Sequence, residues 1–335
     1  MDFLLANFLG TPLWFWLSFL GLVAILLVLD LGVFHRKQRE IGVRESLLMS
    51  AFYIAVGLGF GAFVWATRGE AAGLDYVTGF LVEKSLAMDN VFVIAMIFSY
   101  FAVPRIYQHR VLFWGILGVI VLRAIMIGFG AALVDNFGWV LYIFAAFLIY
   151  TGVKMWTSAD EAYEVAKSPL LGWLKRRFRV TEEMHGERFF VREADPKTGK
   201  MVRAVTPLFL ALVMVEIADV IFAVDSIPAI FAITTDTFIV YTSNVFAILG
   251  LRALFFALSA MIERFHYLKH ALALLLVFIG SKVFIADLFG LVKFPPAVSL
   301  GVTLGILATG IVYSLVRTRE PKVAEAIESE PNRMG

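Results

Sequence analysis

The stretch Glu83-Lys84-Ser85-Leu86-Ala87-Met88-Asp89-Asn90 interrupts an apolar segment with charge, and it has a counterpart 136 residues later in Asp219-Val220-Ile221-Phe222-Ala223-Val224-Asp225-Ser226. In both stretches an acidic residue is followed six residues later by Asp and seven residues later by a small polar residue. An ionisable side chain at the centre of a bilayer costs at least ~2.5–3.5 kcal/mol on insertion scales, so such residues persist mainly where they face a cavity or a partner. The pair of stretches therefore predicts a polar site inside a membrane.

The composition of the chain agrees with a membrane protein. Of its 335 residues, 60% are apolar and 17% are charged, and the mean hydropathy is +0.84. These fractions exclude disordered, collagen-like and coiled-coil classes. A net charge of +2 gives no reason to expect nucleic acid as a partner. The absence of cysteine excludes disulfides, thiolate metal sites and dithiol redox chemistry within this chain.

Nine segments are apolar over the roughly 20 residues that a membrane helix needs. We expect an all-α polytopic membrane protein with spans at Leu13–Phe34, Ser46–Thr67, Tyr76–Ser99, Val111–Val134, Trp139–Trp156, Thr206–Phe231, Phe238–Ile262, Ala271–Phe289 and Phe294–Val316. The first span is too long for the apolar part of a cleavable signal peptide, so we expect it to be retained.

The distribution of Lys and Arg predicts the orientation, because cytoplasmic loops hold the excess. Of the 29 basic residues, 22 lie in alternate loops and the tail, while Arg68 and Lys293 are the two in the other set of loops. The chain is therefore predicted to be N-out and C-in, and the alternation supports nine spans.

The spans and loops predict six regions along the chain. They are a two-helix segment (1–72), a first three-helix repeat (73–157), a basic cytoplasmic loop (158–203), a second three-helix repeat (204–290), a ninth membrane helix (291–317) and a disordered cytoplasmic tail (318–335). The cluster Lys175-Arg176-Arg177 is either a contact for anionic lipid or a positive-inside retention signal.

The repeat extends beyond the acidic stretches. Arg123 has a counterpart in Arg252, and Tyr150-Thr151-Gly152-Val153-Lys154 resembles Phe278-Ile279-Gly280-Ser281-Lys282. Spans three to five thus recur as spans six to eight, and a unit of three spans must enter the membrane from the opposite side the second time. Inverted repeats of this kind are typical of secondary transporters, whose substrate site lies near the midplane where the repeats meet.

The acidic residues of the third and sixth spans are the candidate metal ligands. They are Glu83, Asp89, Glu216, Asp219 and Asp225, with neutral oxygen donors expected from Asn90, Ser226 and Asn244. Pro228 cannot donate to the carbonyl of Val224, which would leave a further oxygen beside Asp225. Such hard donors suit Mn²⁺, Mg²⁺ or Ca²⁺, whereas Zn²⁺ and copper sites usually recruit His or Cys. The residues themselves leave the choice among the three hard cations open.

Five basic residues within the spans balance these acids: Lys84, Arg123, Lys154, Arg252 and Lys282. The charges could therefore form a network of buried ion pairs that holds the bundle together. On that alternative the protein is a membrane scaffold or stress-response component that transports nothing. Phosphate-binding loops and HExxH metalloprotease pairs are absent from the sequence, and we expect no enzymatic activity.

The two acidic stretches, together with Thr242-Ser243-Asn244-Val245-Phe246-Ala247-Ile248-Leu249-Gly250-Leu251-Arg252, resemble the TerC integral membrane family, particularly its Alx-type bacterial members. The similarity extends over about residues 73–314. The resemblance implies a bacterial inner-membrane protein that exports Mn²⁺, with links to tellurium resistance and alkaline stress. It also implies that the acids of the two stretches carry the metal, and that some members serve metalation of exported enzymes or membrane stress complexes instead.

We therefore expect a secondary transporter whose substrate is Mn²⁺, with no permanently bound cofactor and with the lipid bilayer as its surroundings. A homo-oligomer is compatible with the sequence. Proton antiport is a further hypothesis, because a carboxylate that releases a metal inside the bilayer would take up a proton to avoid a buried charge.

Overall fold

The computed structural model describes residues 5–32, 42–157, 168–181, 183–194, 201–258, 268–291 and 294–317. The side chains of a few residues within these ranges, including the predicted ligand Asp89, lie outside the described part. The predicted tail at 318–335 and the first ten residues of the predicted loop, at 158–167, also lie outside it.

The described chain is predominantly helical. Its helices are α2 (Leu13–Gly32), α3 (Val43–Arg68), α4 (Glu70–Tyr100), α5 (Arg105–Asn136), α6 (Val140–Thr157), α7 (Pro169–Arg177), α8 (Pro207–Phe231), α9 (Thr237–Leu249), α10 (Leu251–Leu258), α11 (Leu268–Leu288) and α12 (Pro296–Arg317). Two antiparallel hairpins pair β1 (Asn7–Phe8) with β2 (Thr11–Pro12) and β3 (Phe190–Ala194) with β4 (Met201–Val205).

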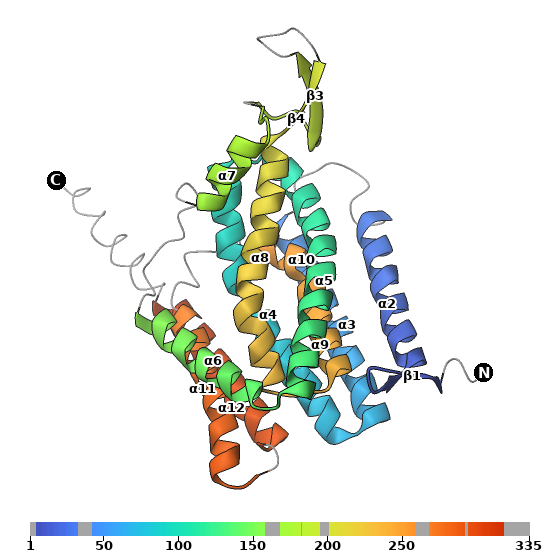
Figure 1. Cartoon of the computed structure of the whole chain (residues 1–335), viewed down its shortest axis with the longest axis vertical. Coiled ribbons are helices and arrows are strands. Elements are labelled where there is room, and N and C mark those ends of the chain that lie inside the picture. Colours follow the sequence, from blue (N-terminus) through green and yellow to red (C-terminus); the bar gives the residue numbers. More distant parts are fainter. Residues whose placement is uncertain are drawn as a thin grey trace, which may run out of the picture.

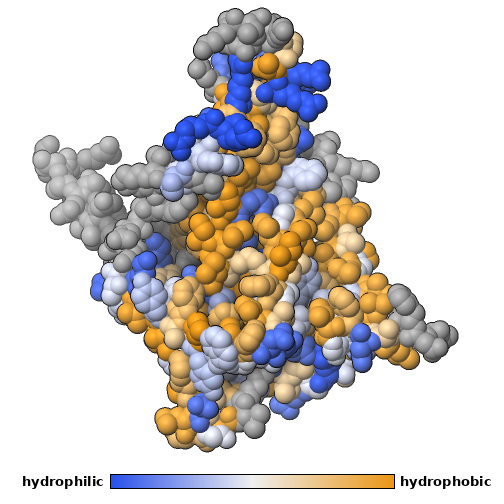
Figure 2. Space-filling model, in the orientation of Figure 1, coloured by the Kyte–Doolittle hydropathy of each residue, from blue (hydrophilic) through white to orange (hydrophobic). Residues whose placement is uncertain are grey.

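The long helices form one bundle with α4 at its centre. Helix α4 contacts α3, α8, α9 and α12, while α5 packs on α8 and α9, and α6 pairs with α11. In Figure 1 the β3–β4 hairpin projects from one end of the bundle, and β1 lies at the opposite end. The bundle exposes large apolar side chains, such as Phe129 on α5, which is 67% exposed, and apolar residues dominate its face in Figure 2. This surface is that of a multi-pass integral membrane protein.

Each of the nine predicted spans overlaps a helix or, at Phe238–Ile262, the pair α9 and α10. By length and composition, six helices of the described chain can cross a membrane: α3, α5, α6, α8, α11 and α12. The pair α9 and α10, bent by 41°, adds a seventh span if it crosses as one. Helix α2 is apolar over the shorter range Leu13–Leu29, and α4 contains the charged stretch around Glu83. The count of nine therefore stays a prediction.

The bend between α9 and α10 occurs at Gly250, beside a buried lysine. The Nζ atom of Lys84 donates to the carbonyl oxygen of Ala247 at 3.0 Å. A Cβ atom at Gly250 would lie 2.6 Å from that Nζ, so the absence of a side chain there makes room for the lysine. Helix α4 thus supplies a hydrogen-bond donor to the last turn of α9, whose carbonyl groups lack partners within the helix.

Helices α6 and α11 approach each other closely through two glycines. A Cβ atom at Gly152 would lie 2.7 Å from the carbonyl oxygen of Ala273, and one at Gly280 would lie 2.5 Å from the carbonyl oxygen of Ala145. Ala273 precedes Gly280 by seven residues, and Ala145 precedes Gly152 by seven residues. The two glycine contacts are therefore equivalent. The two helices are antiparallel, and small residues at such positions let membrane helices pack backbone to backbone.

The β3–β4 hairpin begins in the predicted loop at 158–203 and extends two residues into the predicted second repeat, and no strands were expected in either region. Phe190 pairs with Val205, and Ala194 pairs with Met201 at the other end of the ladder. One residue, Thr206, separates β4 from α8, and its Oγ1 atom accepts from the backbone N–H of Phe209 as the helix N-cap. The hairpin is thereby joined directly to the helix that carries Asp219.

Candidate functional site

A single guanidinium joins the two predicted acidic stretches. Arg123 of α5 donates through Nη1 to the Glu83 carboxylate on α4. Its Nε and Nη2 atoms donate to the two carboxylate oxygens of Asp219 on α8, each at 3.2 Å. This side-on, two-point geometry is the one in which Arg binds carboxylates most strongly. The first acids of the two stretches therefore meet at one cationic side chain.

Two predicted neutral ligands complete the coordination of the guanidinium. Nη1 of Arg123 also lies 3.2 Å from Oγ of Ser226 and 3.1 Å from Oδ1 of Asn244. Asn90, the third predicted neutral donor, contacts the same carboxylate, because its Nδ2 atom donates to Oδ1 of Asp219 at 3.3 Å. We call Glu83, Asn90, Arg123, Asp219, Ser226 and Asn244 the polar cluster.

The polar cluster is closed off from the surroundings of the bundle. Arg123 and Glu83 are each 1% exposed and Asp219 is 6% exposed, while Asn90, Ser226 and Asn244 are also buried. Removing two carboxylates and one guanidinium from water is costly unless each is paired and hydrogen-bonded. The formal charge of the cluster is −1, so its charged groups are not fully balanced by Arg123.

Several polar atoms of the polar cluster have no hydrogen-bond partner among the described residues. They are Oε2 of Glu83, Oδ1 of Asn90 and Nδ2 of Asn244. Buried polar atoms without partners are uncommon in folded proteins and call for an explanation, such as a bound water or ion. Two of these three atoms are oxygens with lone pairs available to a cation.

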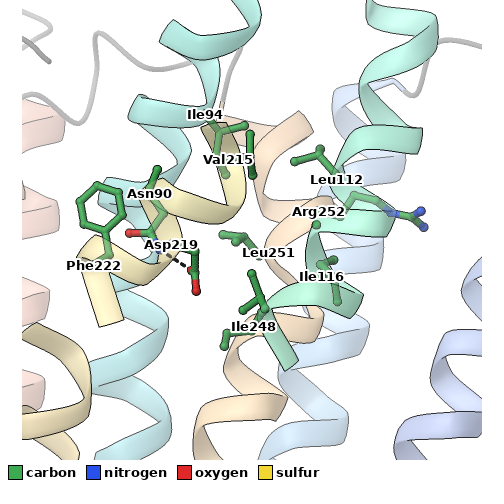
Figure 3. A pocket seen from close by; sticks show the side chains of 13 residues that line it. Asn90, Ile94, Leu112, Ile116, Val215, Asp219, Phe222, Ile248, Leu251 and Arg252 are labelled. Carbon is green, nitrogen blue, oxygen red and sulfur yellow. Dashed lines mark hydrogen bonds between the residues drawn. The ribbon is translucent and has the colours of Figure 1, made fainter. Parts of the chain in front are cut away.

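A small cavity adjoins Asp219 and Asn90 between α4, α5, α8, α9 and α10. Its volume is about 20 Å³, and most of its walls are apolar, including Ile94, Leu112 and Val215. A space of this size holds about one water molecule. Figure 3 shows the Asn90–Asp219 contact at its edge, and the guanidinium of Arg252 points away from Asp219.

Glu216, one turn before Asp219 on α8, lies against α5 and outside the Arg123 contacts. A Cβ atom at Gly118 would overlap its carboxylate, and its Oε2 atom has no hydrogen-bond partner among the described residues. The absence of a side chain at Gly118 therefore makes room for the carboxylate. This neighbour was not among the predicted site residues, although the segment Ile116-Leu117-Gly118 that contains it resembles Ile248-Leu249-Gly250.

Asp225 faces a different helix from Asp219. Its Oδ1 atom accepts from Oγ1 of Thr151 on α6 at 3.3 Å, and Lys154 lies near enough to interact with it electrostatically. Six residues advance an α-helix by about 600°, which places Asp225 well off the face of Asp219, whereas seven residues return Ser226 to that face. Thr151 was missed as a partner, although it stands in the repeated segment of span five.

The other predicted charge-balancing residues have their own surroundings. Lys84 binds the carbonyl of Ala247, Lys282 donates to Oγ of Ser299 at 3.1 Å, and Lys154 is exposed. Arg252 is buried and lines the cavity. Of the five, Arg123 is the residue that the structure places between the predicted ligands.

Among the described residues, no three His, Asp or Glu side chains come together in an arrangement that could hold a metal ion. The described carboxylates of the polar cluster number two, and the side chain of Asp89 lies outside the described part. The donor chemistry of two carboxylates with amide and hydroxyl oxygens still fits a hard cation. In the described conformation, however, the guanidinium is the group that these oxygens bind.

The sequence comparisons agree with the fold. Residues 68–322 match the model of the integral membrane protein TerC family. The chain is 47% identical to an uncharacterized membrane protein of Myxococcus xanthus over 93% of its own length and 95% of the relative. It is 48% identical to the Escherichia coli K12 protein named "Putative membrane-bound redox modulator Alx", over 94% of its own length and 98% of the relative.

No solved structure matches the chain. The family match covers the helices α4 to α12 and thus the whole polar cluster. The identity to bacterial membrane proteins extends over 93% and 94% of the chain in these two matches. The chain therefore belongs to the TerC family of integral membrane proteins.

Proposed function

We propose that the protein exports Mn²⁺ from the cytoplasm across the bacterial inner membrane by alternating access, with Glu83 and Asp219 as central ligands. One observation carries this proposal. Two carboxylates from the two repeated stretches converge on a single cationic group inside the bundle, surrounded by amide and hydroxyl oxygens. A buried position that is built for a cation, in a membrane protein, supports a cation transporter.

The donor set supports a hard divalent cation as the substrate. Carboxylate, amide and hydroxyl oxygens suit Mn²⁺, Mg²⁺ and Ca²⁺. We choose manganese among these because of what the family resemblance implies. Glu216 and Asp225 would serve as outlying ligands or proton carriers along the path of the ion, since they flank the polar cluster on α8.

Nine spans and an inverted repeat are part of the proposal. The reciprocal contact of Gly152 and Gly280 supports the repeat, because a two-fold axis in the membrane plane would relate two antiparallel helices in this way. The position of β1 at the opposite end of the bundle from β3–β4 (Figure 1) supports a chain that starts outside and places its basic loop inside.

A second candidate is a membrane scaffold or stress-response component that moves no ion. The observation that favours it is the Arg123 network itself, because one guanidinium pairs with both central carboxylates. On this alternative the polar cluster contributes to folding alone. Its removal would then change stability and function together.

Cellular manganese separates the two candidates. In an efflux-deficient bacterial strain loaded with manganese, we expect the wild-type protein to lower cellular manganese, and Glu83→Gln or Asp219→Asn to abolish that effect. Mutation of groups around a metal ligand costs about 10- to 100-fold, and the loss of a direct ligand should cost at least as much. The matched control is Asp135→Asn, which neutralises an exposed acid near the end of α5 and should leave export unchanged.

Membrane levels and thermal stability in detergent complete the experiment. The transporter is supported if the two cluster variants are folded yet inactive. If the wild type leaves cellular manganese unchanged, manganese export is contradicted. If Glu83→Gln and Asp219→Asn lose stability in proportion to function, the scaffold is supported. Proton coupling is tested in vesicles, where collapse of the pH gradient should stop efflux.

A further inference from the structure

We propose that Arg123 is a tethered substitute for the transported cation: it occupies the substrate position when the site is empty and must leave before substrate binds. This inference rests on the proposed function and describes how the same site is loaded. It makes Arg123 a positioning residue for the transport cycle, beyond its contribution to charge balance.

The contacts of the guanidinium carry the inference. Arg123 directs three nitrogen atoms at four side chains, and all four are among the eight predicted cation ligands: Glu83, Asp219, Ser226 and Asn244. The acceptors are oxygen atoms throughout. A cation that used these oxygens would have to replace the guanidinium, because one set of lone pairs cannot serve both.

The charges of the site also indicate that a cation must replace the guanidinium. With Arg123 in place the two carboxylates leave a formal charge of −1, and addition of a divalent ion would change this to +1. Like charges within a few ångströms in a weakly polar interior repel strongly. The guanidinium is also 1% exposed, so bulk water does not screen the two cations from each other.

The bundle must open for Arg123 to leave. The adjoining cavity, about 20 Å³ in volume, holds about one water molecule and is too small for a guanidinium group. Helix α5, which carries Arg123, is packed against α8 at Gly130, where a Cβ atom would lie 2.8 Å from the ring of Phe231. Departure of Arg123 therefore requires α5 to move relative to α8, and this movement couples cation binding to a change of conformation.

The contacts of Arg123 also explain how the empty transporter returns to the conformation that binds the next cation. Once the cation leaves, Arg123 neutralises most of the charge of Glu83 and Asp219, so these two carboxylates can cross the membrane barrier without a bound cation of their own. The protons that return in exchange for manganese are then carried by Glu216 and Asp225. Without Arg123, the empty site carries two unpaired carboxylates and is held back by their burial. Such a variant would still exchange one manganese ion for another but would not complete net export.

The test uses the purified full-length protein in detergent and in proteoliposomes. We expect Arg123→Gln to bind Mn²⁺ at least tenfold more tightly than the wild type, measured from the electron paramagnetic resonance signal of free Mn²⁺. In proteoliposomes, Arg123→Gln should lose net Mn²⁺ efflux and retain Mn²⁺/Mn²⁺ exchange. A purely structural arginine would change neither the affinity in this direction nor the ratio of exchange to net efflux.

Two further variants provide a second test of the role of Arg123 and a control on the same helix. Arg123→Lys keeps the positive charge but cannot span both carboxylates, so it should fold and bind Mn²⁺ with intermediate affinity even if Arg123→Gln does not fold. Arg110→Gln, on the same helix, breaks an ion pair with Glu187 outside the polar cluster and should leave the affinity unchanged.

The outcomes separate this inference from the proposed function. Unchanged or weaker Mn²⁺ binding by folded Arg123→Gln or Arg123→Lys overturns the substitute-cation role, and so does loss of exchange together with net efflux. Wild-type protein that neither binds nor exchanges Mn²⁺ contradicts the proposed function, and the inference falls with it.

Discussion

The contact between α6 and α11 is reciprocal, whereas the polar cluster on α4, α5, α8 and α9 is not. At the helix contact, Gly152 lies against Ala273 and Gly280 lies against Ala145, so the two helices use equivalent positions. In the polar cluster, Glu83 and Asp219 occupy equivalent positions in the repeat, but both bind Arg123. Its counterpart Arg252 points away from Asp219 (Figure 3).

The difference shows which parts of an internal repeat can stay alike. Packing of two helices through glycines can be duplicated about a two-fold axis, because each helix serves as the surface for the other. One position for a cation near such an axis can be occupied by one guanidinium and no more. The repeat that we propose can therefore preserve its scaffold in both halves while one half supplies the basic group of the site.

The largest expected effect comes from disruption of the reciprocal contact. Gly280→Leu would force a side chain into the 2.5 Å space against the carbonyl oxygen of Ala145, and overpacking against backbone costs at least ~1–3 kcal/mol. We expect loss of the monodisperse folded peak in fluorescence-detected size-exclusion chromatography, and the same for Gly152→Leu. Gly305→Leu on α12, where a Cβ atom meets nothing within 4 Å, is the control. Equal behaviour of Gly280→Leu and Gly305→Leu would contradict the close contact.

A smaller effect is expected between α5 and α8, beside the polar cluster. Gly118→Ala places a methyl group on the Glu216 carboxylate and should lower thermal stability by about 1–3 kcal/mol. Glu216→Ala should restore much of this loss in the double variant, because the obstacle is then gone. A double-mutant cycle of unfolding free energies measures the coupling. Additive effects of the two substitutions would show that Gly118 and Glu216 do not touch.

The smallest effect concerns the hydrogen bond that links the two regions. Thr151→Val removes the Thr151–Asp225 contact between α6 and α8 while it keeps the branched shape, and a single hydrogen bond contributes about 0.5–1.5 kcal/mol. We expect a slight decrease in melting temperature. Thr157→Val, which removes only contacts of Thr157 to its own helix, provides the comparison. A decrease no greater than that of Thr157→Val would show that this contact contributes nothing.

Hydropathy and charge predicted the helices well because burial in lipid is a property of each segment alone. All nine expected segments overlap helices of the structure, including the charged helix α4. The β3–β4 hairpin and α7 escaped prediction because short polar elements outside the bundle leave no apolar pattern. Their stability comes from contacts to the bundle, such as those of the buried side chains Leu171 and Leu174 of α7.

The site was predicted in part, for reasons of helix geometry. Glu83, Asp219 and Ser226 were identified from the repeat and the seven-residue spacing, and the structure brings them together at Arg123. The five predicted acids do not all meet at this site, because Asp225 follows Asp219 by six residues and therefore lies on another face of α8. Its side chain contacts Thr151 of α6 instead. The bridging position of Arg123 also depends on how α5 packs between its neighbours.

The junction at Thr206 links the β3–β4 hairpin to α8, so that a movement of α8 inside the bundle also moves the hairpin. Besides capping α8, Thr206 donates through Oγ1 to the carbonyl oxygen of Arg188 at 2.7 Å, and the neighbouring Val205 donates through its N–H to the carbonyl oxygen of Arg179 at 2.8 Å. A tilt of α8 must therefore swing the strands with it, and the swing grows with distance from the helix. Because the chain has no cysteine, a spin label attached at one introduced cysteine on β3 and another on α2 would read that swing directly, with no background site to remove.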